Sequence, residues 1–197
     1  MNLLTEPPVQ YIELEGIDYL VNADFRLFIE YEMIVQGPGT IEEKGSKTLQ
    51  LVQRFFNGHN IVDQALAVEA FLWFYQCGEE NRSIKKSETE TARRQRPVYS
   101  FEVDGALIYA AFLDQYRIDL VNIDYLHWWV FRSLMSALRE DHEFKKVMGY
   151  RAMKIDKNMT AEQRKAFRKL KQLYRLPDYR SEEEKEIEFA NSLDALI

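Results

Sequence analysis

The segments IYAAFLDQYRIDL (residues 108–120) and YLHWWVF (residues 125–131) decide the fold class of this chain. Apolar and aromatic side chains recur in them at the three- and four-residue spacing of a helix face. The region from 109 to 151, which contains most of both, holds two of the three tryptophans and two of the three histidines. This pattern predicts a mainly helical domain with a core rich in aromatic rings, because each enclosed ring buries a large apolar area.

We expect the large side chains of this region to form the structural core. The predicted core residues are Tyr109, Phe112, Leu126, Trp128, Trp129 and Phe131. Capping residues predict where the helices start. Within this region, Asp104 is expected to cap one helix and Asn122 or Asp124 the next. Asp141 is expected to cap a short helix that is closed by Gly149.

Upstream, the sequence predicts a β-hairpin at residues 11–21 and then helices within residues 22–78. Apolar and polar residues alternate on both sides of Glu15-Gly16, as in two short strands joined by a tight turn. Asn22 or Asp24 should begin the first helix, and Thr40 or Ser46 the second. A third helix at 61–77 is apolar almost all round, which predicts burial. We expect one compact domain over residues 1–197.

Residues 79–97 interrupt this pattern. They are charged and almost free of apolar side chains, so burial cannot offset the entropy of ordering them. We expect an exposed, mobile loop. Its basic residues Arg93, Arg94 and Arg96 are candidates for partner binding, although a solvated linker is favoured over a nucleic-acid arm.

The helical part resumes over residues 98–176 and ends in a strongly basic helix. Thr160 and Gln163 form a capping-box pattern at its start. Its polar face carries Arg164, Lys165, Arg168 and Lys169. A solvated face is the simplest interpretation; an acidic protein partner, the chain's own acidic helix predicted at 181–197, and nucleic acid remain as alternatives.

Composition limits the class of protein. Hydrophobic residues make up 46% of the 197 residues, which is enough for a buried core. The single Cys77 excludes an intramolecular disulfide and fits a reducing cytosol. No uncharged apolar run approaches the ~20 residues that a membrane span needs.

Charge is distributed in blocks. Residues 1–80 carry 13 acidic and 4 basic side chains, net −9, whereas residues 151–180 carry 3 acidic and 10 basic ones, net +7. Such blocks favour docking to charged partners or between copies of the chain. They argue against a protein built for nucleic acid, which usually has an overall basic footprint.

Catalytic chemistry is poorly supported by the sequence. His127 with Asp124 is the best candidate pair, since residues three apart share a helix face. We favour an N-cap aspartate beside a histidine at the edge of the core, because no partner nucleophile is recognisable. The histidines and Cys77 show no metal-ligand spacing, and no glycine-rich phosphate loop exists. We therefore expect no enzyme activity, cofactor or metal.

Several motifs together resemble one known family, the bacteriophage gene-product-fifteen family of Gram-positive siphophages and prophages. LHWW at 126–129 is the most specific of them. The others are DFR at 24–26, LWFYQCG at 72–78, YSFE at 99–102, IYAAF at 108–112, QY at 115–116, IDL at 118–120, YR at 150–151, LY at 173–174 and LP at 176–177. The resemblance covers nearly the whole chain.

The resemblance implies a binding role in phage assembly. Members of this family are typically encoded between the major tail protein and the tape-measure protein, where tail assembly chaperones are usually found. It therefore implies a non-catalytic chaperone that binds the tape-measure protein and tail-tube subunits in the host bacterial cytoplasm. A structural tail or head–tail component is the alternative, and a nucleic-acid-binding phage factor is a weaker one. The family has no established catalytic residues.

Overall fold

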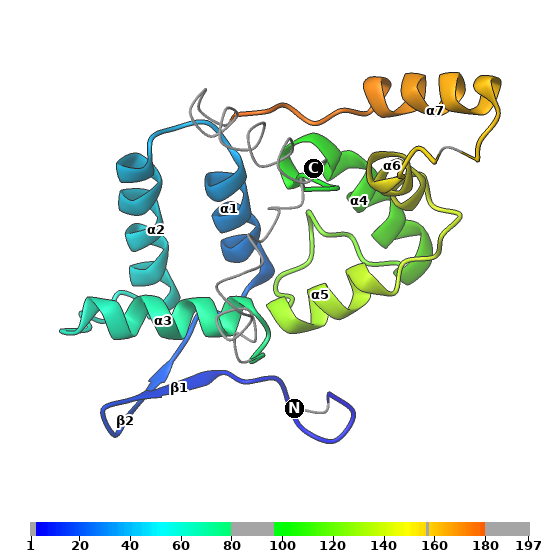
Figure 1. The fold of residues 1–197 in the computed structure, drawn as a ribbon. Coiled ribbons are helices and arrows are strands. Elements are labelled where there is room, and N and C mark those ends of the chain that lie inside the picture. Colours follow the sequence, from blue (N-terminus) through cyan, green and yellow to red (C-terminus); the bar gives the residue numbers. More distant parts are fainter. Residues whose placement is uncertain (1–2, 80–96, 157, 180–197) are drawn as a thin grey trace.

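The computed structural model describes residues 3–79, 97–156 and 158–179, and it is mainly helical, as predicted (Figure 1). The described elements follow one another as β1 (Tyr11–Leu14), β2 (Ile17–Leu20), α1 (Phe25–Gln36), α2 (Ile41–Phe55), α3 (Gln64–Tyr75), α4 (Phe101–Tyr116), α5 (Trp128–Ser136), α6 (Glu143–Ala152) and α7 (Ala161–Leu173). Apart from Glu79 and Pro97, the predicted charged loop lies outside these residues, and so does the predicted acidic C-terminal helix.

The predicted hairpin is present. Glu15 and Gly16 both adopt positive φ angles, 51° and 80°, as a two-residue turn between right-twisted strands requires. Ile12 and Leu14 on β1 are buried, and β1 lies against α3. The hairpin therefore packs on the helical body. This packing is needed because a pair of strands on its own is only marginally stable in water.

Helix α1 is the centre of the arrangement. It contacts α2 on one side and α4 and α5 on the other, so it joins the two halves of the molecule (Figure 1). Asp24 caps its start by accepting from the amide of Arg26. A capping box begins α2, in which Thr40 accepts from the Glu43 amide and the Glu43 side chain accepts from the Thr40 amide. The second helix thus starts after Thr40 and not after Ser46.

Stacked rings fill the space between the two halves. Phe28 of α1 stacks on Phe71, Phe74 and Trp128, with ring centroids 5.1 to 5.5 Å apart. Trp128 continues the stack to Phe131, which also stacks on Phe25 and Phe112. Offset stacking contributes stability beyond the area that each ring buries.

Five of the six predicted core residues are buried: Phe112, Leu126, Trp128, Trp129 and Phe131. The sixth, Tyr109, was predicted wrongly. It is half-buried, lies outside the core cluster, and has its phenol beside the Asp119 carboxylate. Helical spacing places Tyr109 near the core side of α4, but the polar hydroxyl draws it towards the loop after the helix.

The predicted starts of α4, α6 and α5 also differ from the structure. Helix α4 begins at Phe101 after Ser100, so Asp104 lies inside it and is buried. Helix α6 begins after His142 and not after Asp141, and Gly149, the predicted terminator, lies within it. Asp104 accepts from the Ser100 amide all the same, so its side chain still satisfies a free amide at the helix start.

The predicted start of α5 at Asn122 or Asp124 is wrong as well. His127 is the N-cap, and Trp128 is the first helical residue. The side chain of Asp119 accepts from the amides of Val121 and Asn122, which holds that segment in a turn instead of a helix.

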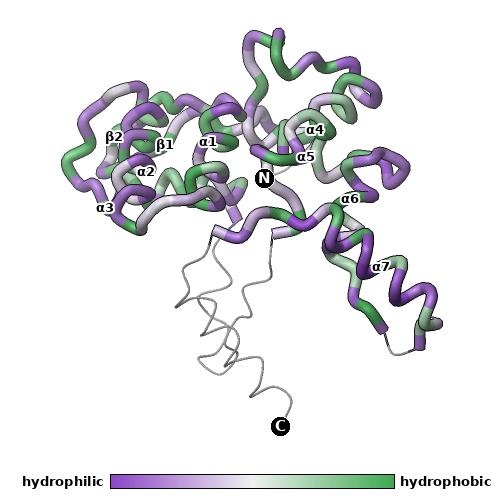
Figure 2. The backbone as a smooth tube through the Cα atoms, turned by 90° about the horizontal axis from the view of Figure 1, so that it is seen from above, coloured by the Kyte–Doolittle hydropathy of each residue, from purple (hydrophilic) through white to green (hydrophobic). Residues whose placement is uncertain are grey.

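The last described helix lies at the edge of the molecule. Helix α7 follows the predicted capping box of Thr160 and Gln163 and packs against α6 (Figure 1). Figure 2 shows it standing away from the body and mostly hydrophilic. No helix among the described residues is long and apolar enough to cross a bilayer.

Candidate functional site

His127, the best catalytic candidate in the sequence, holds backbone groups together. Its Nδ1 accepts from the Trp129 amide at 3.0 Å, and its Nε2 lies 2.9 Å from the Val9 carbonyl oxygen. These contacts fit a neutral ring protonated on Nε2. Burial lowers the pKa of His127 and favours the same state. Its proposed partner Asp124 is exposed, and no contact among the described residues joins the two.

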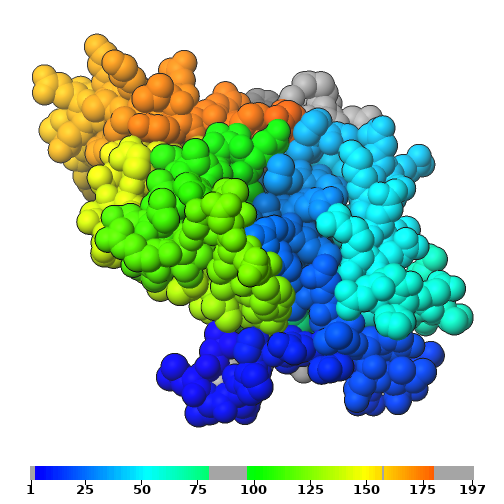
Figure 3. Space-filling view, turned by 180° about the vertical axis from the view of Figure 1, so that it is seen from behind, coloured from blue at the N-terminus to red at the C-terminus, as the bar shows by residue number. Residues whose placement is uncertain are grey.

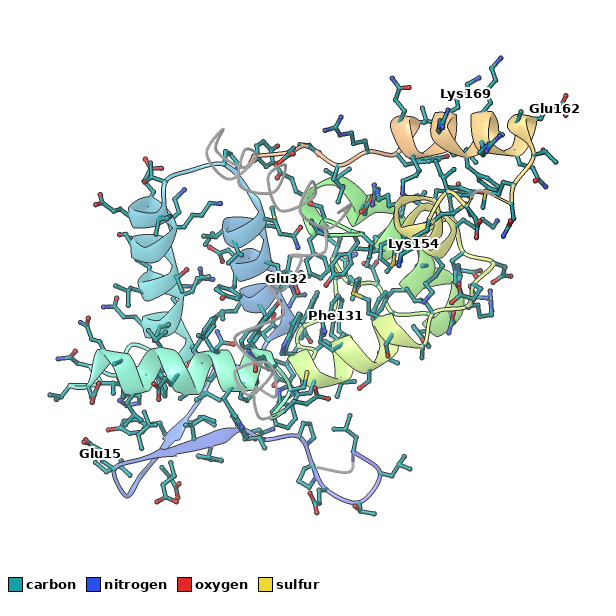
Figure 4. All side chains as sticks on the ribbon, viewed as in Figure 1. Glu15, Glu32, Phe131, Lys154, Glu162 and Lys169 are labelled. Atoms are coloured by element: carbon teal, nitrogen blue, oxygen red, sulfur yellow. The ribbon has the colours of Figure 1, made fainter. Side chains whose placement is uncertain are left out.

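A buried carboxylate on α1, which sequence reasoning missed, gathers side chains from four segments. Glu32 is 4% exposed and lies in the middle of the molecule (Figure 4). The hydroxyl of Tyr75 donates to its Oε1 at 2.9 Å, and that of Tyr99 to its Oε2 at 3.1 Å. Gln36 donates to the same carboxylate, and Arg132 forms an ion pair with it at 3.6 Å.

Burial dominates the electrostatics of this cluster. It raises the pKa of Glu32, although the two phenols and Arg132 oppose the shift. Burial and the neighbouring Glu32 together raise the pKa of Tyr99 to about 12. Burial also raises the pKa of the nearby Cys77 thiol, which disfavours the nucleophilic thiolate. Tyr75 comes before residues 80–96 in the sequence and Tyr99 after them, so Glu32 joins two described parts of the chain to α1.

An ion pair that is buried on both sides holds the C-terminal half together. Asp104 of α4 and Arg151 of α6 are joined by two hydrogen bonds, of 2.6 and 2.9 Å, with side chains 2% and 8% exposed. Arg151 also donates to the carbonyls of Val98 and Tyr174. One guanidinium therefore links α4, α6 and the end of α7. Gln36 of the Glu32 cluster lines one of the two pockets described for these residues, whereas Glu32, Asp104 and Arg151 line neither of them.

The predicted basic face is present on α7 in part. Lys165, Arg168 and Lys169 are exposed, and Lys169 points away from the body (Figure 4). Arg164 is half-buried. Lys171, a further basic residue of α7, donates to the carbonyls of Arg151 and Met153 and so caps the end of α6. The other basic candidates, Arg93, Arg94 and Arg96, lie outside the described residues.

An open groove of about 390 Å³ lies between β1 and α3 and is here called the β1–α3 groove. It is lined by Tyr11, Ile12, Glu13, Leu14, Leu66, Glu69, Ala70 and Trp73. Tyr11 is 57% and Trp73 37% exposed. The apolar pattern of α3 predicts burial almost all round, but the helix presents one face to this groove. Seen from behind, the hairpin and the segment before it form the lower rim of the molecule (Figure 3).

The charge of the groove has one sign. Glu13 and Glu69 are its only ionisable side chains apart from the Tyr11 phenol. No lysine or arginine occurs in residues 1–25 or 55–79, the two stretches that contain β1, β2 and α3. An apolar surface bordered only by acidic groups suits a ligand that is apolar along its middle and basic at its edges.

Comparison with known proteins agrees with the motifs of the sequence. The model of one protein family, described as "Bacteriophage Gp15 protein", matches residues 4–176. No curated protein and no solved structure matches the chain. The matched region runs from the segment before the hairpin to just beyond α7, and it includes the groove, the Glu32 cluster and the Asp104–Arg151 pair. The chain therefore belongs to the bacteriophage Gp15 protein family.

Proposed function

We propose that this phage protein is a non-catalytic tail assembly factor, a chaperone that binds the tape-measure protein and tail-tube subunits in the host bacterial cytoplasm. Family membership supports a role in the phage life cycle. The more specific role depends on the gene order that is typical of the resembling family, together with the surface chemistry of the chain.

The observation that carries the proposal is the contrast between the interior and the β1–α3 groove. The buried polar residues of the described part of the chain are Glu32, Asp104 and His127, and each forms hydrogen bonds that hold segments of the chain together. Apolar area is left open in the groove, next to Trp73. A molecule of this kind is equipped to hold another polypeptide, because an exposed apolar patch with a charged rim is typical of interaction sites.

A chaperone for the tape-measure protein would need to keep that long chain from associating with itself until assembly. Covering its apolar segments reversibly would serve that purpose. The exposed basic side chains Lys165, Arg168 and Lys169 of α7 offer a second surface of opposite sign for an acidic partner such as a tube subunit. Opposite signs on separate surfaces allow two different partners to be distinguished.

Co-purification tests the proposal. The tagged full-length chain is co-expressed with overlapping fragments that cover the tape-measure protein, and we expect at least one fragment to be retained at modest salt. Ala70→Arg, which places a bulky cation in the groove, should abolish retention. Ala110→Arg is the matched control because Ala110 is exposed on α4.

Two results would contradict the proposal. The first is that no fragment binds at tens of micromolar protein while circular dichroism shows that the chain is folded. The second is stoichiometric presence of the chain in finished particles. That result would make the protein a structural tail or head–tail component and not an assembly factor that is absent from the finished particle.

A further inference from the structure

The hairpin has a free edge along the β1–α3 groove. In an antiparallel ladder, alternate residues direct their amide and carbonyl groups to the partner strand, and the others direct them outward. The Val21 amide donates to the Gln10 carbonyl at 2.9 Å, and Ile12 is paired with Tyr19. This phase turns the backbone groups of Tyr11 and Glu13 outward, away from β2.

These outward groups have no backbone partner in the described parts of the chain. No hydrogen bond among residues 3–79, 97–156 and 158–179 uses the amide or carbonyl of Tyr11 or Glu13. All four residues of β1 line the groove, so its edge faces the space beside Leu66, Ala70 and Trp73 of α3. An unpaired strand edge of this kind is a template for another strand.

The pleat of β1 divides the side chains that a docked strand would meet. Ile12 and Leu14 point to the buried side of the hairpin, and Tyr11 and Glu13 point to the opposite side. A strand added to this edge would continue both faces. Every second residue would pack beside α3 and should be apolar, whereas the residues between would lie beside Glu13 and should be basic.

Charge argues against a second copy of this chain as the occupant. Pairing two β1 edges would bring together two strands whose only charged residue is glutamate, near the Glu69 of each α3. Like charges across neighbouring strands are destabilising. The acidic edge thus disfavours pairing between two β1 edges and favours a partner strand that carries lysine or arginine.

We infer that the β1–α3 groove binds an extended segment of another polypeptide by β-strand addition, and that this segment alternates aliphatic with basic residues. The inference rests on the proposed function and specifies how the partner is held: as a strand, not as a helix. Main-chain hydrogen bonds to Tyr11 and Glu13 provide affinity, while Trp73 and the two glutamates provide selectivity.

The test uses a defined probe, the fluorescein-labelled peptide Lys-Val-Lys-Val-Lys-Val-Lys, titrated with the full-length chain by fluorescence anisotropy. We expect binding that weakens with salt, and no binding of Glu-Val-Glu-Val-Glu-Val-Glu. Two further probes carry N-methyl groups on all lysine amides or on all valine amides. Strand addition requires that one of them binds and the other does not, because only alternate amides face β1.

Variants of one residue isolate the backbone contribution. Tyr11→Pro and Tyr11→Ala both remove the ring, but only the proline removes the outward amide, and a proline is tolerated at an outward-facing position of an edge strand. We expect Tyr11→Pro to bind the probe at least about fivefold more weakly than Tyr11→Ala, the ratio that corresponds to one net hydrogen bond. Thermal melting of both variants verifies that the fold is intact.

Several results would overturn the inference. They are equal affinity of the two Tyr11 variants, loss of binding by both methylated peptides (as helix docking predicts), binding insensitive to methylation, and a dimer that buries β1. The proposed function can fail separately. If the peptide binds as expected but no tape-measure fragment is retained, the groove binds strands and its natural partner is another protein. If fragments are retained but the peptide is not bound, the partner is held elsewhere.

Discussion

Removal of one member of the Asp104–Arg151 pair should destabilise the protein more than most single substitutions. The two side chains are 2% and 8% exposed and share two hydrogen bonds of 2.6 and 2.9 Å. Asp104→Ala leaves the Arg151 guanidinium buried without its counter-ion. Arg151→Met likewise leaves the Asp104 carboxylate buried and unpaired. Stranding a buried charge in this way typically costs ~3–5 kcal/mol of unfolding free energy.

A double-mutant cycle separates the pair from its surroundings. Arg151→Met should cost the more of the two, because the Val98 and Tyr174 carbonyls also lose their donor. The double variant Asp104→Ala/Arg151→Met should cost no more than Arg151→Met alone, since no charge is then left unpaired. Two residues in direct contact are expected to be coupled by ~0.5–3 kcal/mol.

Urea denaturation followed by circular dichroism and tryptophan fluorescence measures these free energies. Arg151→Lys is the matched control: it keeps the charge but cannot form the two-bonded pair, so it should fall between the wild-type chain and Arg151→Met. Strict additivity of the two single substitutions, or a cost below about 1 kcal/mol for Asp104→Ala, would refute the reasoning.

Three further predictions concern the core and its buried ionisable groups. Trp129→Ala, which empties a site 4% exposed and removes the bond to the Phe74 carbonyl, should cost ~3–5 kcal/mol, and an unchanged melting temperature would contradict it. Because burial lowers the pKa of His127 below its usual 6.5, the unfolding free energy should fall as the pH drops from 6.5 towards the native pKa. His127→Asn keeps a capping side chain and should lose that slope; an equal slope in both proteins would show that His127 is not its source. Burial raises the pKa of Glu32, so its contribution is complete below about pH 4.5 and is lost as the pH rises through the native pKa. Urea titrations across this range should show the loss in the wild-type chain and not in Glu32→Gln, and identical curves would contradict the assignment.

The helical class, the hairpin and most of the aromatic core follow from local patterns in the sequence. Alternation around Glu15-Gly16 and the capping box at Thr160 are signals that only a few neighbouring residues determine. Trp128 and Phe131 could be assigned to the core because large rings in a helical pattern have few other places to be stable.

The boundaries that failed depend on partners distant in the sequence. Asp104 has the sequence position of a cap, but Arg151, 47 residues later, pairs with it. His127 caps α5 because its ring also reaches Val9, 118 residues earlier. The periodicity of apolar residues carries no information on such pairs. From the sequence alone, Glu32 would be assigned to the surface, and only the fold shows that Tyr75 and Tyr99 donate to it.

The groove was beyond sequence reasoning for a related reason. Trp73 and Leu66 belong to a helix that is apolar almost all round, so the pattern predicted burial on every side. Only the position of β1 determines which face of α3 stays open. The excess of acidic residues before residue 80 was visible in the sequence, but its concentration around one apolar surface was not.

Hydrogen–deuterium exchange of the full-length chain, with and without a retained tape-measure fragment, tests most directly whether the β1–α3 groove holds a polypeptide. We predict that the fragment slows exchange at residues 11–14, where free edge amides would gain partners, and at 66–73 of α3. Protection confined to other segments, with residues 11–14 exchanging as fast as in the free chain, would contradict the account.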